Sequence, residues 1–512
     1  MLSLVVDVGT QKMKVSVFDT KGRILRGESV EYDPPYFSPK PGWAEYDPED
    51  YWKLFLSLGK KVVRGVEEKV KAVVVTTQRD SLVFMDREGK VLRPAILWLD
   101  HREAKYDLKL PFYEKFIYWL VRKLPVIRSV YKGAAVNWVR QNEPHVWKNT
   151  YKVMQLSGFF LQRLTGKFVD SVASQIGHIP FDYKRQKWCK ESDLKARLFP
   201  IPKEKLVDLV KPCTVIGKLR KEVKDILGVD TYVVAAGSDK GCETLGVGVV
   251  KDDEISLSLS TTSTVQTTTK KYFETIPHLP PYPGIIEGTY NPEVEIFRGF
   301  WLVRWFRDEF AHLEKRKARE IGVPPEELID EMLKSVPAGS MGLITYPFWT
   351  PSLDKPEARG SIVGFQSFHK REHLYRSLIE GLFYALRDGK EMIERRGKLK
   401  FKVAKIAGGG SSSDEIASIA ASIMKLPVYR EITGEAASLG AAIVSFCGMG
   451  VFNDLNEGVK EMVHLEGPFE PNKKEEEIYD FIYGKVYKKL YGRLKKLYDT
   501  LYNGSDFLDQ GI

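Results

Sequence analysis

The stretch of residues 7–14, DVGTQKMK, combines residue types suited to holding an anion. Gly9 permits a tight turn whose backbone N–H groups can face a phosphate. Thr10 and Gln11 add hydrogen-bonding side chains, and Lys14 adds positive charge. Asp7 stands at the end of an apolar run and could hold a magnesium ion through water. An ordinary β-hairpin has the same composition, so this motif alone favours neither interpretation.

A second carboxylate, Asp239, follows the apolar residues 232–236 in the sequence GSDKG. The carboxyl end of a buried strand is where α/β folds place their ligands. A carboxylate there can accept a proton from an attacking hydroxyl. The same residue can also cap the helix that follows, and for this motif alone capping is the commoner role.

Two polar turns stand in the second half of the chain. Residues 259–264, LSTTST, place hydroxyl groups between two apolar stretches, as a phosphate cradle or a plain threonine-rich turn would. Residues 407–413, AGGGSSS, lie between a predicted strand and a predicted helix that Ser413 or Asp414 can cap. The glycines allow a flat ring or a phosphate to approach the backbone closely. The spacing matches neither GxxxxGK[ST] nor GxGxxG.

The elements that must position these residues follow an α/β pattern that restarts midway. Apolar runs at 4–6, 15–18 and 72–75 predict strands, and Asp47 and Pro48 predict the start of a helix over 48–70. After residue 251 a strand, a hydroxyl-rich turn and another strand follow in the same way. A helix over 371–396, a strand over 403–407 and a helical C-terminal stretch over 473–503 complete the pattern. We therefore predict two halves built on the same plan.

Composition and charge exclude several classes of protein. The 512 residues allow roughly three domains or two large ones, and 43% hydrophobic residues exclude a disordered chain. The net charge of +10 comes from 78 basic and 68 acidic residues that are interspersed. This pattern favours a solvated surface, or an acidic phosphorylated ligand, over nucleic acid.

The cysteines and apolar runs indicate where the protein works. Four cysteines without a CxxC pair form neither a disulfide framework nor a zinc site, which favours a reducing cytoplasm. No apolar run reaches about 18 residues, and no signal peptide precedes the first strand. We expect a cytoplasmic protein with no nucleic-acid or membrane partner.

Taken together, these motifs and their order resemble the FGGY carbohydrate kinases, the family of glycerol, xylulose and gluconate kinases. The resemblance runs from Val5 to about Gly450. It also rests on PGWAEYDPEDYW at 41–52, TTQRDSLVFMDREGKVLRPAILWLDHR at 76–102 and GEAASLGAAI at 434–443. It implies two actin-like, ribonuclease H-like α/β domains around a central cleft, plus a C-terminal helix. The implied domains are a sugar-binding domain at 1–247, a nucleotide-binding domain at 248–455 and a helical extension at 456–512.

The resemblance also implies roles for individual residues. The reaction would be ATP-dependent phosphorylation of a hydroxyl of a ketose, polyol or sugar acid. Asp239 would be the general base, and Asp7 and Asp239 would approach Mg²⁺. The residues implied in nucleotide binding are Gly9, Thr10, Gln11, Lys14, Thr261, Thr262, Gly409, Gly410 and Ser413. Those implied in substrate binding are Gln78, Arg79, Asp80, Trp98, Asp100, Asp239 and Lys240, of which Trp98 and Asp100 either line the pocket or order its wall.

The chain departs from the family pattern at five positions. Ser260 and Ser263 replace glycines of the second phosphate loop, and Ile416 stands where the adenosine motif usually has tryptophan. Val130 stands where a tyrosine helps to enclose glycerol, and Lys240 replaces a glutamine or asparagine. These departures predict a substrate larger than glycerol, with glycerol as the alternative.

Two questions remain open at this stage. An actin-like regulatory or binding protein without phosphotransfer is the alternative function, although the retained Asp7 and Asp239 argue against it. A homodimer is common in the family, and the sequence does not decide the oligomeric state.

Overall fold

The computed structural model describes residues 1–120, 123–352 and 354–503. The described chain forms two compact units. Unit 1 holds residues 1–246, 282–289 and 437–463, and unit 2 holds residues 247–281, 290–436 and the chain from 464 onward. The domain boundaries at 247 and 455 remain a prediction. The two units are defined by packing, and residues 437–463 pack with unit 1.

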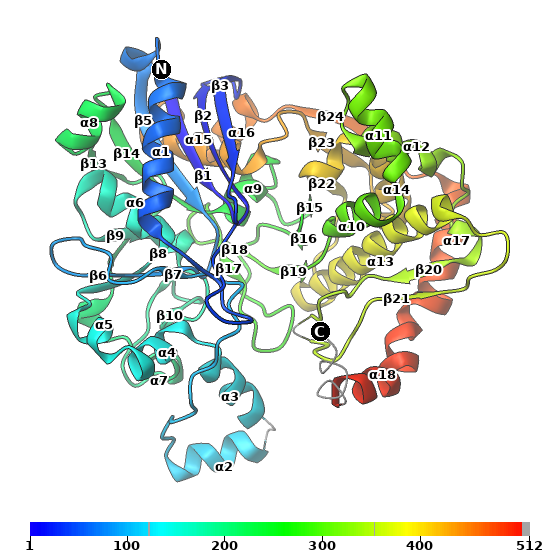
Figure 1. Ribbon diagram of the computed structural model, residues 1–512, viewed down its shortest axis with the longest axis horizontal. Coiled ribbons are helices and arrows are strands. Elements are labelled where there is room, and N and C mark those ends of the chain that lie inside the picture. Colours follow the sequence, from blue (N-terminus) through cyan, green and yellow to red (C-terminus); the bar gives the residue numbers. More distant parts are fainter. Residues whose placement is uncertain (121–122, 353, 504–512) are drawn as a thin grey trace. The chain divides into compact units, whose positions relative to one another are not determined.

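Unit 1 is built on a six-stranded sheet (Figure 1). Its order is β13 (Val215–Lys218), β14 (Tyr232–Ser238), β5 (Val70–Thr77), β1 (Leu2–Val8), β2 (Lys12–Asp19) and β3 (Ile24–Glu31). The three central strands β14, β5 and β1 are parallel. They are nearly continuous apolar runs, as strands covered on both faces require. The exposed edge strand β3 carries charged side chains, which oppose pairing with another chain.

Helices cover both faces of this sheet. Alternate residues of β1, from Leu2 to Val8, pack in one core with α1 (Pro48–Val63) and α6 (Leu156–Thr165). On the other face, Ser445 of α15 (Ala436–Gly448) lies 2.6 Å from Ser3, oxygen to oxygen. The helix predicted over 48–70 ends early because Gly65 adopts a φ of +80°, which a helix cannot continue through.

The remaining elements of unit 1 are short. The strands are β4 (Glu45–Tyr46), β6 (Leu82–Met85), β7 (Ala95–Ile96), β8 (Lys152–Gln155), β9 (Val169–Ser171), β10 (Phe181–Asp182), β11 (Lys187–Trp188), β12 (Asp208–Val210) and β17 (Tyr282–Pro283). The helices are α2 (Phe112–Leu120), α3 (Leu124–Lys132), α4 (Ala135–Asn142), α5 (Pro144–Asn149), α7 (Leu194–Leu198), α8 (Lys221–Leu227), α9 (Asp239–Gly246) and α16 (Leu455–Met462).

Unit 2 repeats the topology of unit 1. Its six-stranded sheet has the order β19 (Glu293–Ile296), β16 (Ser263–Gln266), β15 (Glu254–Leu259), β22 (Val403–Ala407), β23 (Val428–Glu431) and β24 (Leu465–Phe469). In both sheets a parallel trio is flanked by antiparallel strands, and five of the six strands follow the same chain order. The sixth, an edge strand, differs, because β13 precedes β14 in the chain whereas β24 follows β23. The expectation of two halves on one plan is confirmed, and it matches an actin-like fold.

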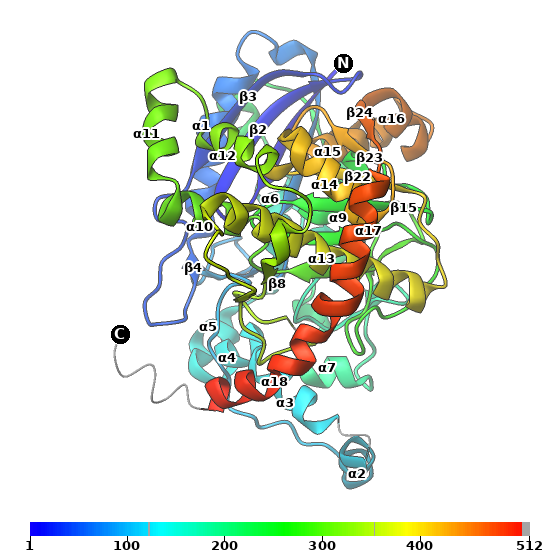
Figure 2. The same cartoon turned by 90° about the vertical axis from the view of Figure 1, so that its right-hand side faces the viewer.

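The helices of unit 2 include a long C-terminal segment (Figure 2). Tyr479 and Tyr483 of this segment are buried in the core of unit 2, as expected for a C-terminal helix packed on the body. The elements are α10 (Trp301–Phe310), α11 (His312–Ile321), α12 (Pro325–Lys334), α13 (Arg371–Gly397), α14 (Asp414–Met424), α17 (Lys473–Ile482), a π-helical turn (Tyr483–Tyr487) and α18 (Lys488–Asn503), with strands β18 (Tyr290–Asn291), β20 (Ile344–Tyr346) and β21 (Ser361–Val363).

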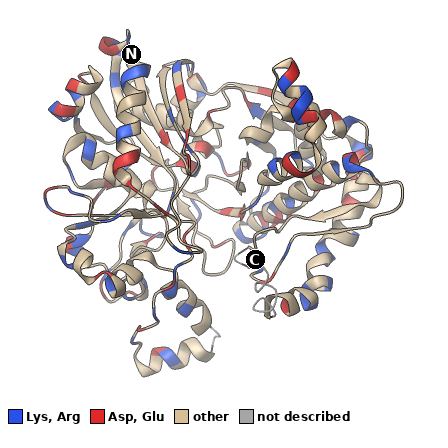
Figure 3. Cartoon of the chain, viewed as in Figure 1, with Lys and Arg blue, Asp and Glu red and all other residues tan. Residues whose placement is uncertain are grey.

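Charge and hydropathy are distributed as the sequence predicts. Figure 3 shows basic and acidic residues interspersed along the described chain. Within the described residues, none of the helices combines the length and the hydropathy that a membrane crossing requires.

Candidate active site

The parallel strands of unit 1 bring three polar residues to one edge of the sheet. Asp7, near the end of β1, lies in register with Thr76 of β5. Ser238 ends β14 beside the end of β5, and Asp239 follows it directly. Gln78 follows β5 itself. Residues that are far apart in sequence are thus neighbours because parallel strands end at a common edge.

The turn after β1 is tied to this edge by side-chain hydrogen bonds. The Gly9 N–H donates to the Lys12 carbonyl at 3.1 Å, which closes the turn. The Thr10 hydroxyl donates to Gln78 Oε1 at 2.9 Å, and Trp98 Nε1 donates to the Thr10 oxygen at 3.0 Å. Three residues predicted to bind nucleotide or substrate therefore form one chain of contacts.

The two other residues predicted for this turn lie on the same hairpin. The Gln11 carbonyl accepts a hydrogen bond from the Tyr32 N–H at 2.9 Å, which anchors the turn to the chain beyond β3. Lys14 is the register partner of Asp7, so the two side chains share a face of the hairpin. A cation beside a carboxylate at this turn suits the binding of a metal-bound phosphate.

Asp239 begins α9 and is held by the backbone that follows it. Its Oδ1 accepts the Lys240 N–H at 2.8 Å. Burial raises the pKa of Asp239 above its ordinary value, although the nearby charges of Arg79 and Lys240 act in the opposite direction. A buried carboxylate of raised pKa accepts a proton more readily than an exposed one.

Lys240 is paired with a carboxylate one turn along α9. Its Nζ lies 2.8 Å from Glu243 Oε2, and both side chains are nearly buried. Burial alone would lower the pKa of Lys240, but the charges of Glu243 and Asp239 raise it above its ordinary value. The lysine is therefore held as a cation within a neutral pair.

Asp80 is engaged by His178, a residue that the sequence did not single out. The backbone N–H of His178 donates to Asp80 Oδ1 at 2.9 Å, and His178 Nδ1 lies 2.6 Å from Oδ2. Burial acts against the charge on both groups, yet their mutual attraction lowers the pKa of Asp80 and raises that of His178. Gly177 is required here because a Cβ at that position would lie 2.0 Å from Asp80 Oδ1.

No sequence signal marks His178 as part of the site. It lies 98 residues from Asp80, in a short loop between apolar residues. Arg79, beside Asp80, places its guanidinium 4.9 Å from the centre of the Tyr282 ring. The structure thus brings His178 and Tyr282, from separate parts of unit 1, to the adjacent residues Arg79 and Asp80.

Asp100 orders the wall of unit 1 through Arg102. Its two oxygens accept bonds from Arg102 Nε at 2.8 Å and Nη2 at 2.7 Å. The guanidinium lies 3.9 Å from the Trp43 ring centre and 4.7 Å from that of Trp138. The side chain of Asp100 is 2% exposed, so of the two roles considered for it the geometry favours ordering the wall. A direct contact with substrate stays a prediction.

In unit 2 the two predicted nucleotide loops contact each other. A Cβ at Gly408 would lie 2.6 Å from the Ser260 hydroxyl, so the glycine permits this approach. Gly409 has open space around its Cα, whereas a Cβ at Gly410 would lie 2.2 Å from the Phe300 ring. Within this arrangement the hydroxyl of Thr262 donates to the Phe297 carbonyl at 3.1 Å.

The other residues of these loops have local structural partners. The Thr261 carbonyl accepts from the Trp301 N–H at 3.4 Å. Ser413 caps α14 by accepting the Ile416 N–H at 3.4 Å, and the Ile416 side chain is buried in the core of unit 2. Ile416 therefore fills the core, and the open face of the loop lies at Gly409.

Comparison with models of known protein families shows which family the chain belongs to. The model of the N-terminal domain of the FGGY family of carbohydrate kinases matches residues 2–246, and that of the C-terminal domain matches residues 256–449. The chain belongs to the FGGY family of carbohydrate kinases. It is therefore a phosphotransferase that uses ATP to phosphorylate a carbohydrate, which sets aside the alternative of a binding protein without phosphotransfer.

Individual relatives cover nearly the whole chain. A xylulose kinase of Lactococcus lactis is 27% identical, over 99% of this chain and 99% of its own length. A glycerol kinase of Aquifex aeolicus is 28% identical, over 92% of this chain and 94% of its own. The crystal structure of a gluconate kinase from Lactobacillus acidophilus superposes with a TM-score of 0.81 at 22% identity, covering 98% of this chain and 100% of that one. This last likeness shows the shared fold.

A metal ion in this kinase would rest on few protein ligands. No group of three or more histidine, cysteine, aspartate or glutamate side chains suited to a metal occurs among the described residues. Asp7 lies near the end of β1 and Asp239 directly follows β14, on either side of β5, so their backbones are about 10 Å apart. Magnesium usually binds one or two carboxylates together with phosphate oxygens and water. The residues present fit a metal that arrives with the nucleotide.

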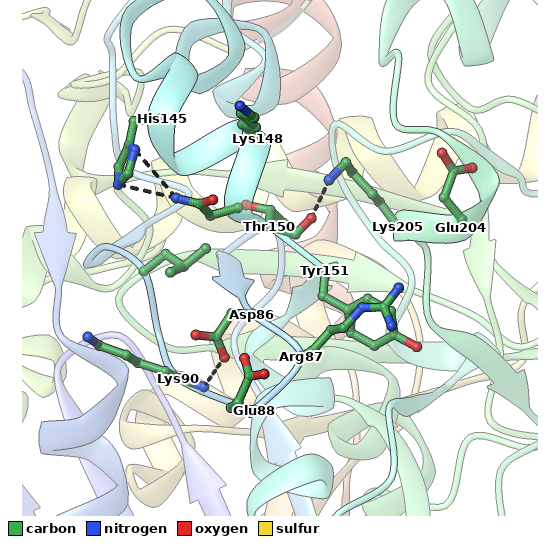
Figure 4. A pocket seen from close by; sticks show the side chains of 12 residues that line it. Asp86, Arg87, Glu88, Lys90, His145, Lys148, Thr150, Tyr151, Glu204 and Lys205 are labelled. Carbon is green, nitrogen blue, oxygen red and sulfur yellow. Dashed lines mark hydrogen bonds between the residues drawn. The ribbon is translucent and has the colours of Figure 1, made fainter.

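A separate hollow in unit 1 of the kinase lies beyond Met85, at the end of β6 that is farther along the chain from Asp80 (Figure 4). Its volume is about 700 Å³, and it is lined by Asp86, Arg87, Glu88, Lys90, Leu92, His145, Lys148, Asn149, Thr150, Tyr151, Glu204 and Lys205. Lys205, a half-buried cation of this set, already donates to the carbonyls of Trp147 and Thr150. None of the predicted site residues lines this hollow.

Proposed function

We propose that this kinase phosphorylates a neutral, polyhydroxylated carbohydrate, a ketose or a polyol larger than glycerol, with Asp239 as the general base. The observation that supports this most directly is the half-buried position of Asp239 at the common edge of β14, β5 and β1, where desolvation raises its pKa. In its ionised form this carboxylate can accept the proton of the attacking hydroxyl as the phosphoryl group is transferred.

The balance of charge around Asp239 supports a neutral substrate. Two cations, Arg79 and Lys240, and the imidazole of His178 are accompanied by the carboxylates of Asp80, Asp239 and Glu243. His178 and Lys240 each have a carboxylate oxygen within 2.8 Å. A sugar acid would bring a further negative charge to a site that already holds as many carboxylates as basic groups, whereas hydroxyl groups can share its donors and acceptors.

A coupled assay of ADP release with ATP and magnesium tests the proposal. The panel would contain ketoses, polyols, glycerol and sugar acids of matched length, and the product would be identified by NMR. We expect the highest kcat/KM with a ketose or a longer polyol. A sugar acid or glycerol as the best substrate would refute the assignment of substrate class.

We propose further that the donor is Mg²⁺-ATP and that Asp7 holds the ion through water. The support is the position of Asp7 beside the phosphate-binding turn, in register with Lys14. When bound, the ion would neutralise charge on the phosphates. We expect Asp7→Ala to raise the magnesium concentration needed for half-maximal activity by about tenfold or more. Magnesium titrations of both proteins at fixed ATP measure this, and superimposable curves would remove Asp7 from the metal site.

His178 is proposed as a substrate-positioning residue, with Asp80 orienting it. The two hydrogen bonds from His178 occupy both Asp80 oxygens, which leaves the imidazole Nε2–H as the donor this pair can offer. A polar contact to a substrate hydroxyl is worth about 1–3 kcal/mol when it is lost. We expect His178→Leu to raise the carbohydrate KM about 10- to 100-fold, with the KM for ATP unchanged.

Steady-state kinetics with each substrate varied separately would measure this effect. His178→Gln, which keeps a donor, serves as the conservative comparison and should recover part of the loss. Equal changes in both KM values would instead point to general damage to unit 1.

A further inference from the structure

Two cysteines that are far apart in the sequence lie side by side in unit 1. Cys447 belongs to the last turn of α15, and Cys213 lies in the loop between β12 and β13. The residue after Cys447 packs directly on this loop, because a Cβ at Gly448 would lie 2.5 Å from the Cys213 carbonyl oxygen. Both cysteines are free thiols, and their side chains hydrogen-bond to each other. This contact brings together two groups that oxidation can join.

The backbone on both sides of this contact is held in place. The Cys213 N–H donates to the Ala235 carbonyl at 2.9 Å, which fixes the loop against β14. Cys213 has a φ of +65°, a left-handed conformation that is uncommon for a residue other than glycine. The Cys447 carbonyl accepts the Gly450 N–H at 3.0 Å, which closes the turn after α15. Thiols that already touch need only a change of side-chain torsions to reach bonding distance.

The two thiols differ in how readily they react. The hydrogen bond from Cys213 lowers the pKa of Cys447 below its ordinary value, although burial and the charges of Asp454 and Glu457 act in the opposite direction. The same hydrogen bond, together with burial, raises the pKa of Cys213. Because the thiolate is the reactive form, Cys447 is the attacking group and Cys213 is its partner. Both residues are half-buried, so solvent has partial access to the pair.

The other two cysteines are placed differently. Cys242 is 0% exposed, and its thiol is directed to the Gly237 carbonyl at 3.8 Å. Cys189 is half-buried beside β11, and burial raises its pKa to about 11. A buried or protonated thiol reacts slowly with oxidants. The pair of Cys213 and Cys447 is therefore the place in unit 1 that is best suited to oxidation.

We propose that Cys213 and Cys447 form a reversible disulfide when the kinase meets a hydroperoxide. In the first step the Cys447 sulfur attacks one peroxide oxygen. A sulfur–oxygen bond forms, the oxygen–oxygen bond breaks, and the hydroxide that leaves takes up the proton released by Cys447. In the second step the Cys213 sulfur attacks the Cys447 sulfur, and hydroxide leaves with the Cys213 proton as water. The thiols lose two electrons, and hydrogen peroxide becomes two molecules of water.

This bond would fasten a segment that returns to unit 1 from unit 2. The chain enters unit 1 again at residue 437 and leaves it at residue 463, and Cys447 lies between these points. The closed loop would contain residues 247–281 and 290–436 of unit 2. A cross-link that closes so long a loop strongly restricts the unfolded chain. We therefore expect the oxidised kinase to melt at a higher temperature than the reduced one.

Treatment of the reduced full chain with hydrogen peroxide tests the proposal. Free thiols are then blocked with iodoacetamide, and the chain is digested without reductant for mass spectrometry. We expect a peptide pair that joins Cys213 to Cys447 and disappears with dithiothreitol. The oxidised chain should melt about 5 °C or more above the reduced chain. Cys189→Ser is the matched control, because it replaces another half-buried cysteine and should keep both effects.

Two variants separate the roles of the paired thiols. Cys213→Ser keeps a hydrogen-bond donor beside Cys447 but has no sulfur to close the disulfide. Cys447 should therefore accumulate as the sulfenic acid, which dimedone captures. Cys213→Ala removes the donor as well and should slow the labelling of Cys447 by dimedone about three- to tenfold. Circular dichroism of the reduced variants checks that each is folded.

Three outcomes would overturn the proposal. The first is a peroxide-treated chain in which Cys447 is carried to the sulfinic acid while Cys213 remains a free thiol. The second is a link between Cys213 and Cys242 in place of the expected pair. The third is a linked chain that melts at the temperature of the reduced chain, which would refute the fastening of residues 437–463. These experiments use no carbohydrate, so they are independent of the proposed reaction.

Discussion

Asp239→Asn should lower kcat with the best carbohydrate by about 10²–10⁴-fold, the usual contribution of a general base. The asparagine can still accept the Lys240 N–H through its side-chain oxygen, so the start of α9 is kept while the proton acceptor is lost. Measured kcat at saturating ATP and carbohydrate gives the effect. Near-normal turnover would show that Asp239 is not the base.

Asp454→Asn is a matched control for this variant. Asp454 caps α16 in the same unit by accepting the Glu457 N–H at 2.9 Å, and it lies outside the predicted site. Its replacement should leave kcat unchanged. A loss in both variants would indicate that capping, and not proton transfer, is what the substitution removes.

Asp239→Asn should not lower the free energy of unfolding at neutral pH. Because the folded pKa of Asp239 lies above its unfolded value, the folded state holds this proton more tightly. The carboxyl therefore favours folding most when it is protonated, and this contribution falls as the pH rises through the raised pKa. We expect the melting temperature of Asp239→Asn, relative to the native chain, to improve from acidic to neutral pH. A trend in the opposite direction would contradict the raised pKa.

Lys240→Met should lower the apparent free energy of unfolding by about 3 kcal/mol, because it leaves the Glu243 carboxylate buried without its cation. Adding Glu243→Gln removes that charge and should restore most of the stability. Urea denaturation of the single and double variants measures both effects. A single variant as stable as the native chain would show that the pair contributes no stability.

Two comparisons separate stability from substrate binding at Lys240. Lys53→Met removes an exposed partner of Asp50 and should change stability by less than about 0.5 kcal/mol. In the stable double variant, kcat/KM for the best carbohydrate should remain lower than native while the KM for ATP is unchanged. Full recovery of kcat/KM would assign Lys240 a purely structural role.

Much of the architecture follows from local sequence pattern. Apolar runs predict β1, β5, β14, β15 and β22, and turn residues predict the polar loops that follow them. Pro48 and Asp47 predict the start of α1, where the Asp47 side chain accepts the Glu49 N–H at 2.9 Å. These features depend on neighbouring residues in the chain, so spacing and composition are sufficient to find them.

Two features of the fold differ from what the local sequence pattern predicts. The helix expected to reach residue 70 ends at Val63, and Gly65 beyond it adopts a left-handed φ of +80°. The assignment of residues 437–463 to unit 1 depends on contacts of α15 with β1, through Ser445 and Ser3, and with α9, where Gly440 lies against Cys242. Neither is encoded by a local periodicity.

By itself the sequence determined the alternation of strands and helices, the duplicated plan and the motifs that reveal the family. Only the tertiary structure decided that His178 binds Asp80 across 98 residues and that α2 turns its aromatic side chains outward. The physical reason is that backbone propensity and hydrophobic period act over a few residues. The partner of a buried charge, or the exposure of an apolar face, depends on which distant segments the sheet brings together.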